Sequence, residues 1–203
     1  MESIILASAS SRRQELLTQI GVRFTVRSQY IDESIRIGEL ANDYVSRMAQ
    51  EKANSALSAL CVTKDSNDTL VLAADTSVVC DATVFGKPLD EADAVDMLRC
   101  LSGREHRVLT AVTLSTQDKQ RTVLSESRVR FREISIKEAQ QYYRSGEPLG
   151  KAGAYAIQGY AAVFVEQLVG SYSGVMGLPL FETALLLAEF SVPMQSINPS
   201  LVK

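Results

Sequence analysis

Ile4-Ile-Leu-Ala-Ser-Ala-Ser-Ser-Arg-Arg-Gln-Glu15 is the stretch around which the rest of the chain is organised. Its apolar start, residues 4–6, predicts a short strand, and small hydroxyl residues then lead directly into a helix. Ser11 and Gln14 have the spacing of a capping box, which predicts that the helix begins at Ser11. The free N–H groups and the positive dipole end of such a helix favour a bound phosphate.

Two arginines, Arg12 and Arg13, lie in the first turn of this predicted helix. Their planar guanidinium groups suit bidentate contact with phosphate oxygens, whereas cations at a helix start oppose the helix dipole. A bound anion would explain their placement. A solvated basic turn is the alternative, and this stretch alone leaves both interpretations open.

The composition is that of an ordinary globular protein. With 203 residues, of which 46% are hydrophobic and 22% charged, the chain can form one domain or two small lobes. The formal net charge of −3 gives no basic face for double-stranded nucleic acid, so we expect no such partner. The chain shows no secretory signal, no apolar run of 18 residues and no CxxC pair. We therefore expect a cytoplasmic protein with no membrane partner, disulfide or zinc site.

An acidic pair, Asp32 and Glu33, lies in a predicted loop before a long helical pattern over residues 39–60. Lys52 borders the apolar stripe of that helix, with apolar residues four positions before and after it. A lysine in this position either extends along the stripe edge into solvent or delivers its ammonium group into a polar site. The pattern leaves both possibilities open.

Residues 70–79 form a near-continuous apolar run, typical of a strand buried on both faces, and Asp75 interrupts it. An ionised carboxylate without a partner is costly in such a place. Asp75 therefore requires a metal ion or a lysine, unless the strand has already emerged from the core. Phe85-Gly-Lys-Pro88 predicts a tight turn that presents Lys87 on a rigid loop, and Asp90 is expected to cap the next helix.

The second half of the chain predicts further strands and helices. Residues 107–115 and 122–131 predict an antiparallel hairpin, so the sheet is expected to be mixed. Ser135 and Glu138 form a second capping-box pattern, opening a helix that is expected to stop at Gly146.

The last third is rich in small and apolar residues. The density of glycine between residues 150 and 177 indicates a close approach of the backbone to another group. A final helix is expected over residues 180–190, with a loose tail over residues 191–203. His106 is the only histidine, and we expect it to be structural.

Carboxylates, lysines and an arginine-bearing helix start together suit metal-assisted attack of water on a polyphosphate. In that scheme a divalent cation neutralises phosphate charge, and a carboxylate activates the water. The chain has no serine–histidine or cysteine–histidine pattern and no GxxxxGK loop.

The same residues carry a family resemblance. The chain resembles the Maf proteins, which are nucleoside triphosphate pyrophosphatases related in fold to the inosine triphosphate pyrophosphatases. The resemblance covers residues 6–189. It rests on Ser8-Ala-Ser-Ser-Arg-Arg13, Glu51-Lys-Ala53, Ala74-Asp-Thr76, Gly86-Lys-Pro88, Leu101-Ser-Gly103, Lys151-Ala-Gly-Ala-Tyr-Ala-Ile-Gln-Gly159, Gly170-Ser-Tyr172 and Gly177-Leu-Pro-Leu180. Ser11 replaces a proline that is common in the family, and because serine can cap a helix this puts little in doubt.

The resemblance implies an α/β fold with an elongated, twisted, mixed sheet flanked by helices. It implies a single domain over residues 1–190, with two lobes and a central cleft. Proteins of this kind often form homodimers, so a homodimer is also implied. The implied reaction is hydrolysis of the α–β bond of a nucleoside triphosphate to a monophosphate and pyrophosphate, with Mg²⁺ or Mn²⁺ as the cofactor. The nucleoside triphosphate is the implied partner molecule.

The resemblance also implies roles for individual residues. Asp75 is implied as the general base for water, and Glu33 as a metal ligand or a partner of Asp75. Lys52 and Lys87 are implied to act in catalysis by binding and neutralising the phosphates. The implied metal ligands are Glu33 and Asp75, and the implied phosphate-binding residues are Ser8, Ser10 and Arg13.

Substrate choice in the family is associated with three positions, occupied here by Arg12, Thr76 and Gln158. This combination resembles the branch that acts on dTTP and UTP. The sister branch, which acts on 7-methyl-GTP, typically has an aromatic residue, a glutamine and a glutamate there. A neutral glutamine amide can both donate to and accept from the imide edge of uracil or thymine.

Two alternatives to a dTTP/UTP pyrophosphatase remain open from the sequence. One is a 7-methyl-GTP pyrophosphatase, and the other is a non-catalytic nucleotide-binding regulator of cell division. Asp75 argues against the regulator, because a carboxylate beside bound phosphates repels them unless a metal ion intervenes.

Overall fold

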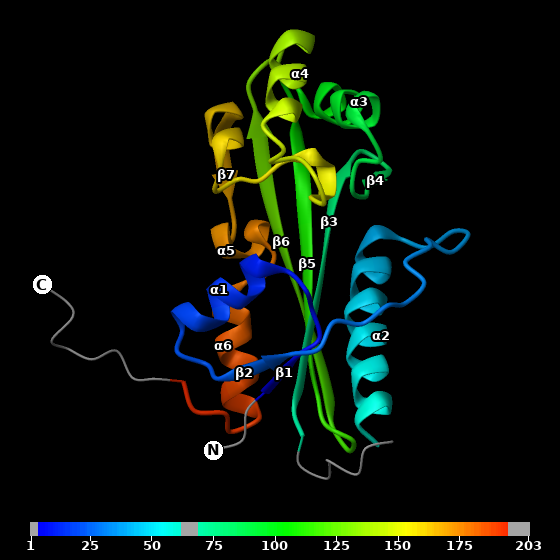
Figure 1. Ribbon diagram of the computed structural model, residues 1–203, viewed down its shortest axis with the longest axis vertical. Helices are drawn as coiled ribbons and strands as arrows, with labels where there is room; N and C mark the ends of the chain where they lie inside the picture. The colour runs from blue at the N-terminus through cyan, green and yellow to red at the C-terminus, as the bar shows by residue number, and fades with distance from the viewer. Residues whose placement is uncertain (1–3, 62–68, 195–203) are drawn as a thin grey trace, which may run out of the picture.

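The computed structural model describes residues 4–61 and 69–194, which form an elongated molecule built on one long sheet (Figure 1). The strands are β1 (Ile4–Leu6), β2 (Phe24–Val26), β3 (Val71–Cys80), β4 (Thr83–Phe85), β5 (Glu105–Ser115), β6 (Gln120–Phe131) and β7 (Val165–Val169). The helices are α1 (Ser11–Gln19), α2 (Ala41–Cys61), α3 (Glu91–Leu101), α4 (Ile136–Arg144), α5 (Tyr172–Met176) and α6 (Leu180–Glu189). Two short 3₁₀ turns lie at Ala152–Ala154 and Tyr160–Phe164.

In the described part of the chain, seven strands form one mixed sheet in the order β2-β1-β3-β5-β6-β7, and β4 pairs with β3 outside this order. β1 is parallel to β2 and β3, and the remaining pairs are antiparallel. Because β5 occupies one edge of β3 along nearly its whole length, β1 and β4 must share the other edge. β1 pairs with Val71 and Leu72, and β4 pairs from Val78 onward, so no described strand pairs with residues 73–77 on this edge. We call this interruption the β3 gap.

Helices cover both faces of the sheet beside the β3 gap (Figure 1). Val71 and Ala73 pack against α2 on one face, whereas Leu72 and Ala74 belong to a cluster with α1 and α6 on the other. Because successive side chains of a strand point to opposite faces, the next residues continue this alternation. Asp75 therefore faces α2, and the residue after it faces α1.

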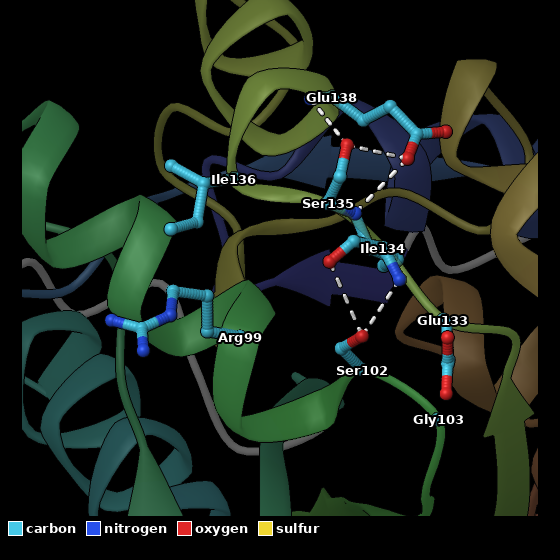
Figure 2. A pocket seen from close by; sticks show the side chains of 8 residues that line it. All are labelled: Arg99, Ser102, Gly103, Glu133, Ile134, Ser135, Ile136 and Glu138. Atoms are coloured by element: carbon cyan, nitrogen blue, oxygen red, sulfur yellow. Dashed lines mark hydrogen bonds between the residues drawn. The ribbon is translucent and has the colours of Figure 1, made fainter.

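At the other end of the long strands the sheet is covered by α3 and α4 (Figure 1). Ser102 follows α3, and its hydroxyl oxygen accepts a hydrogen bond from Ile134 N at 2.7 Å and lies 3.3 Å from Ile134 O. These contacts hold the end of α3 against the start of α4, beside an open hollow of about 640 Å³ (Figure 2).

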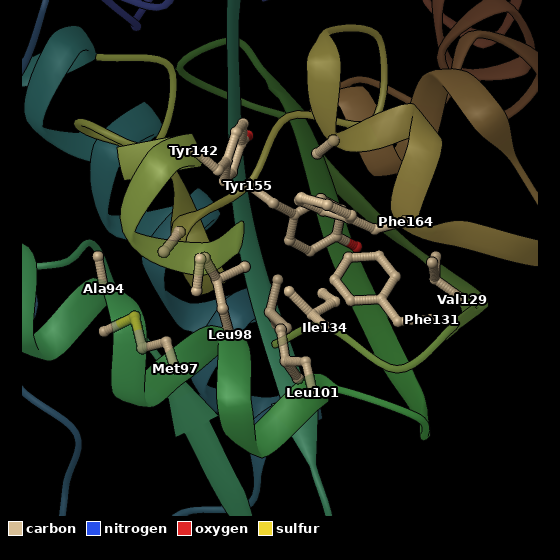
Figure 3. Close-up of a cluster of buried hydrophobic side chains, with 14 of the residues drawn as sticks. Ala94, Met97, Leu98, Leu101, Val129, Phe131, Ile134, Tyr142, Tyr155 and Phe164 are labelled. Carbon is tan, nitrogen blue, oxygen red and sulfur yellow. The ribbon is translucent and has the colours of Figure 1, made fainter. Parts of the chain in front are cut away.

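A large hydrophobic cluster lies beneath α3 and α4 (Figure 3). It contains Leu98, Phe131, Tyr142 and Phe164, all nearly or fully buried. β3 and β5 run from this cluster into the cluster beneath α1 and α6. The two cores thus share strands, and the β3 gap lies between them.

The expected fold class is confirmed, including the mixed sheet and the antiparallel hairpin of β5 and β6. The capping box of α4 is also present, because Ser135 Oγ accepts from Glu138 N and the Glu138 carboxylate accepts from Ser135 N. β5 and β6 each begin two residues earlier than expected. Cross-strand pairing at Glu105 and Gln120 extends the hairpin beyond its apolar pattern.

The predicted cap of α1 was wrong by one residue. Ser11 is the first helical residue, and Ser10 is the N-cap, with its hydroxyl oxygen 3.5 Å from the N–H of Arg13. The Ser11–Gln14 capping box is therefore absent. Because Ser10 and Ser11 are adjacent, either serine could cap the helix. The structure uses Ser10, whose backbone is extended.

Other boundaries differ slightly from expectation. The expected strand over residues 22–26 is limited to β2, and α2 begins at Ala41 rather than residue 39. The expected tail begins with an ordered contact, since Val192 N donates to Leu187 O at 2.8 Å. Residues 195–203 and the polar loop over residues 65–68 lie outside the described residues.

Cys80 and Cys100 are free thiols. None of the helices in the described ranges is both long enough and apolar enough to cross a membrane.

Candidate active site

Asp75 lies at the β3 gap and is paired with Lys52. Lys52, on α2, places its Nζ 2.6 Å from Asp75 Oδ1 and 2.7 Å from Glu33 Oε1. The side chains of Lys52 and Asp75 are only 12% and 13% exposed, respectively. Of the possibilities left open for these residues, the structure shows a lysine that delivers its ammonium group to the buried carboxylate.

The second oxygen of Asp75, Oδ2, accepts no hydrogen bond from the residues that the structure describes. An ionised carboxylate has acceptor sites on both oxygens. Asp75 is thus held by Lys52 at one oxygen and can accept a proton at the other.

Glu33 reaches the site from the loop between β2 and α2, and this loop is fastened to α2. Tyr44 Oη donates to Glu33 O at 2.8 Å, and Arg47 Nη2 donates to Ser34 O at 3.0 Å. Arg47 also forms an ion pair with Glu39. Burial raises the pKa of Tyr44 to about 12, and the negative charges of Asp75 and Glu33 add to this shift. The tyrosine therefore stays protonated and remains a donor.

The Glu33 carboxylate is surrounded by cations. Partial burial acts to raise its pKa, but the hydrogen bond and charge of Lys52, with the charges of Lys87 and Arg13, lower the pKa of Glu33 overall. Lys87 follows β4 and is 64% exposed, with its Nζ 4.0 Å from Glu33 Oε2. The structure thus brings Glu33, Lys52, Asp75 and Lys87 together.

Arg13 points inward from α1 and is held at three positions. Its Nε donates to Gly177 O at 2.8 Å, its Nη1 to Ser8 Oγ at 3.1 Å and its Nη2 to Thr76 Oγ1 at 3.2 Å. A guanidinium group has five N–H donors, so two remain for a ligand. Burial lowers the pKa of Arg13, and the negative charges of Asp75 and Glu33 oppose this effect. Arginine remains cationic in proteins, so Arg13 presents a fixed positive charge at the site.

Ser8 and Ser10 lie in the turn between β1 and α1. Ser8 Oγ accepts from Arg13 and, at 3.2 Å, from Ser10 N, while Ser10 Oγ caps the helix. No acceptor for either hydroxyl proton is found among the described residues. Both serines can therefore donate to an anion at the helix start.

The three residues at the positions associated with substrate choice differ in their location and contacts. Arg12 lies on the outer side of α1 and forms an ion pair with Glu15 at 2.7 Å. Thr76 contacts Arg13 within the site. Gln158 is partly buried in a turn, and within the described ranges no hydrogen bond or ion pair joins it to Arg12 or Thr76. The structure thus brings only Thr76 into contact with the other predicted site residues.

Sequence reasoning missed Tyr44 and did not assign Gly177. Gly177 has a φ of 118°, a backbone conformation that residues with a side chain rarely adopt. Its carbonyl oxygen accepts a hydrogen bond from Arg13 Nε. The close backbone approach expected for this region is found at other glycines, because a Cβ at Gly153, Gly159 or Gly170 would lie less than 3.0 Å from Val78, Glu147 or Ser127, respectively. No comparable signal marked Tyr44, because a tyrosine on an amphipathic helix reads as part of its apolar stripe.

The carboxylates fit a divalent cation with few protein ligands. In the described part of the chain, no group of three or more histidine, cysteine, aspartate or glutamate side chains could hold a metal ion. Mg²⁺ commonly binds one or two carboxylates and takes its remaining ligands from water and substrate phosphates. Asp75 and Glu33 both contact the ammonium group of Lys52, and these two carboxylates would supply such ligands.

Two other polar features lie away from the site. The hollow in Figure 2 lies between α3 and α4, and none of the predicted site residues lines it. His106 is buried and its Nε2 lies 2.9 Å from Tyr155 Oη. Burial lowers the pKa of His106 to about 4, so it is neutral at physiological pH and structural, as expected.

The chain matches the family described as Maf-like protein over residues 3–190. A dTTP/UTP pyrophosphatase of Hahella chejuensis is 49% identical to it over 193 residues, which cover 95% of this chain and 94% of the relative. A dTTP/UTP pyrophosphatase of Cupriavidus metallidurans is 51% identical over 196 residues, which cover 93% and 98%. A third, of Methylococcus capsulatus, is 52% identical over 184 residues, which cover 91% and 89%. The resemblance found in the motifs is confirmed, and the chain belongs to the Maf-like protein family.

Proposed function

We propose that this protein is a nucleoside triphosphate pyrophosphatase that converts dTTP and UTP to the monophosphate and pyrophosphate. One observation carries the proposal: a buried carboxylate with one oxygen available, Asp75, lies in a gap of the sheet beside Lys52, Lys87 and Arg13. The relatives named dTTP/UTP pyrophosphatase match this chain over more than nine-tenths of its length, which supports the substrate class.

In the proposed reaction, Asp75 Oδ2 takes a proton from a water molecule as the water oxygen attacks phosphorus. The bond between the α-phosphoryl group and the bridging oxygen breaks, and pyrophosphate leaves with that bond's electron pair. Arg13 and Lys87 bind and neutralise the phosphate oxygens, and Ser8 and Ser10 donate to them from the helix start. Lys52 holds and orients the Asp75 carboxylate through the contact at Oδ1.

We further propose that Mg²⁺ or Mn²⁺ binds at Glu33 and Asp75 together with the substrate phosphates. When bound, the cation would supply charge neutralisation and polarise the phosphoryl group. We also infer a cytoplasmic location, a homodimer and no nucleic-acid partner, since the family resemblance and the net charge of −3 favour them. Removal of modified pyrimidine nucleotides is a role compatible with this activity.

Specificity is proposed to involve Gln158, with Arg12 and Thr76. An amide held in one orientation matches the O4 acceptor and the N3–H donor of uracil, whereas cytosine presents the reverse pattern. A mismatch that leaves buried polar groups unpaired costs about 1–3 kcal/mol, or roughly ten- to a hundredfold in kcat/KM.

The test is a panel of triphosphates with the purified protein and Mg²⁺ or Mn²⁺, with pyrophosphate release as the measurement. We expect dTTP and UTP to exceed CTP by at least about tenfold, with ATP, GTP and 7-methyl-GTP weaker still. Gln158→Glu should reduce UTP turnover, because a carboxylate loses the donor that O4 requires, and Gln141→Glu on the exposed face of α4 is the control.

Equal rates for UTP and CTP would remove Gln158 as the residue that recognises the base. A preference for 7-methyl-GTP would assign the chain to the sister branch. No turnover of any nucleotide would leave only a nucleotide-binding regulator.

A further inference from the structure

Thr110, in the middle of β5, is connected to Arg13 through a row of hydroxyl groups. Thr110 is the cross-strand partner of Thr76, and their hydroxyl oxygens are 3.0 Å apart. Thr110 Oγ1 also lies 2.8 Å from the carbonyl oxygen of Gly174 in α5. Thr110 is only 1% exposed, so water does not compete for these contacts.

The direction of every hydrogen bond in this row is determined. A carbonyl oxygen can only accept, so the hydroxyl proton of Thr110 goes to Gly174 O. Thr110 Oγ1 must then accept from Thr76, which uses the only proton of the Thr76 hydroxyl. Thr76 Oγ1 is left as an acceptor toward Arg13 Nη2, which can only donate.

The row closes into a ring through α5. Gly174 O also accepts from Gly177 N at 3.0 Å, and Gly177 O receives Arg13 Nε at 2.8 Å. Arg13 is therefore held at Nη2 by the threonine side of the ring and at Nε by the α5 side. Thr110 is the member that joins the two sides, because it contacts both Thr76 and Gly174.

We propose that Thr110 is a positioning residue for Arg13. Its hydroxyl group orients Thr76 as an acceptor and anchors α5, so that the two remaining N–H donors of Arg13 point at the phosphates. This rests on the proposed function of Arg13 in phosphate binding. The ring also restricts Thr76, which can meet a substrate atom only as an acceptor because its proton is already used.

The test compares Thr110→Val, Thr110→Ser and the control Thr113→Val. Thr113 lies on the same strand, is 0% exposed and shares a 2.9 Å contact with the hydroxyl of Thr122, but it faces α2 and has no connection to Arg13. Each valine variant therefore removes one buried hydroxyl group from β5, and only the hydroxyl group of Thr110 is connected to Arg13. If Thr110→Val does not fold, Thr110→Ala replaces it, with folding checked by thermal denaturation.

We expect Thr110→Val to raise the KM for UTP and to lower kcat/KM by about tenfold or more, since it leaves the Thr76 hydroxyl without its acceptor. Thr110→Ser should restore kcat/KM to within about threefold of the wild type, and Thr113→Val should leave it within the same range. Loss of folded protein alone would lower the apparent kcat with KM unchanged.

A double-variant cycle identifies the route of the effect. In an Arg13→Ala background, adding Thr110→Val should change kcat/KM by less than about twofold, because the residue through which Thr110 acts is gone. An undiminished effect in that background, or equal effects of the Thr110 and Thr113 valine variants, would overturn the proposal. Failure of Thr110→Ser to restore activity would do the same.

A binding measurement separates this proposal from the proposed function. Calorimetry with α,β-methylene UTP in the presence of a chelator reports phosphate binding without turnover. We expect Thr110→Val to weaken this binding by about tenfold and Thr113→Val to leave it unchanged. The wild type could hydrolyse no nucleotide while Thr110→Val still binds the analogue more weakly than Thr113→Val does. In that case the proposed reaction is wrong and the positioning role of Thr110 holds. Equal binding by both variants would contradict the positioning role.

Discussion

A single ammonium group, that of Lys52, lies between two carboxylates at the β3 gap. Lys52 and Asp75 are nearly buried, while Glu33 is 46% exposed. A buried carboxylate that loses its cation retains the cost of desolvation without the compensating attraction. Lys52 therefore contributes to the stability of the site as well as to its proposed chemistry.

Lys52→Met should lower the free energy of unfolding by about 1–3 kcal/mol. The expected loss of stability is smaller than the roughly 3–5 kcal/mol that follows when one partner of a fully buried ion pair is removed, because Glu33 is half-exposed. Urea denaturation at pH 7 measures the change, with Lys137→Met on the exposed surface of α4 as the control. Adding Asp75→Asn to Lys52→Met should recover part of the loss, and a double variant less stable than the single one would contradict this account.

Which arginine enters the site could be argued only partly from the sequence. Arg13 lies three and four residues before Leu16 and Leu17, which face the core, so helical periodicity favours it over Arg12. For Asp75 the sequence indicated a metal ion or a lysine as the partner, but it could not identify Lys52. The ion pair of Asp75 with Lys52 joins residues 23 positions apart through the packing of α2 on β3, and local patterns carry no information on such contacts.

At the scale of elements, the loop between β2 and α2 is positioned by α2. Arg47 bridges Glu39 and the backbone of the loop, and its hydrogen bond to the Glu39 carboxylate is the main cause that lowers the pKa of Glu39 to about 2. A carboxylate whose pKa is depressed on folding adds stability above its ordinary pKa of about 4.5. That stability is lost as the pH falls toward 2.

Glu39→Gln should therefore lower Tm by a constant amount between pH 5 and pH 7, and the difference from the wild type should shrink progressively below about pH 4.5. Thermal denaturation from pH 7 to pH 3 measures it. Glu126→Gln, which removes the exposed partner of Arg107, is the control and should change Tm little. A difference for Glu39→Gln that does not vary with pH would show that the ion pair is not its source.

The main elements could be predicted because their signals are local. The capping box of α4 and the apolar runs of β3 and β5 lie within short windows of the chain. The β3 gap could not be predicted in the same way. It depends on where β1 stops and β4 starts along one edge, and β4 has three residues that pair only with β3.

At the scale of the whole molecule, the site draws on segments from most of the chain. The turn after β1, the β2–α2 loop, α2, the middle of β3 and the turns after β4 and α5 all contribute. They meet because β3 runs from one hydrophobic core into the other and has no described partner strand on one of its two edges where its burial is interrupted. Composition and periodicity alone do not predict this convergence, whereas the family resemblance implied the site residues that meet there.

We propose that Asp75 in the β3 gap activates water for cleavage between the α- and β-phosphoryl groups. The most direct measurement follows UTP by ³¹P NMR with Mg²⁺, using the wild type and Asp75→Asn. The wild type should yield UMP and pyrophosphate, and Asp75→Asn should be at least about 100-fold slower while remaining folded. Formation of UDP and phosphate, or near-normal turnover by Asp75→Asn, would contradict the account.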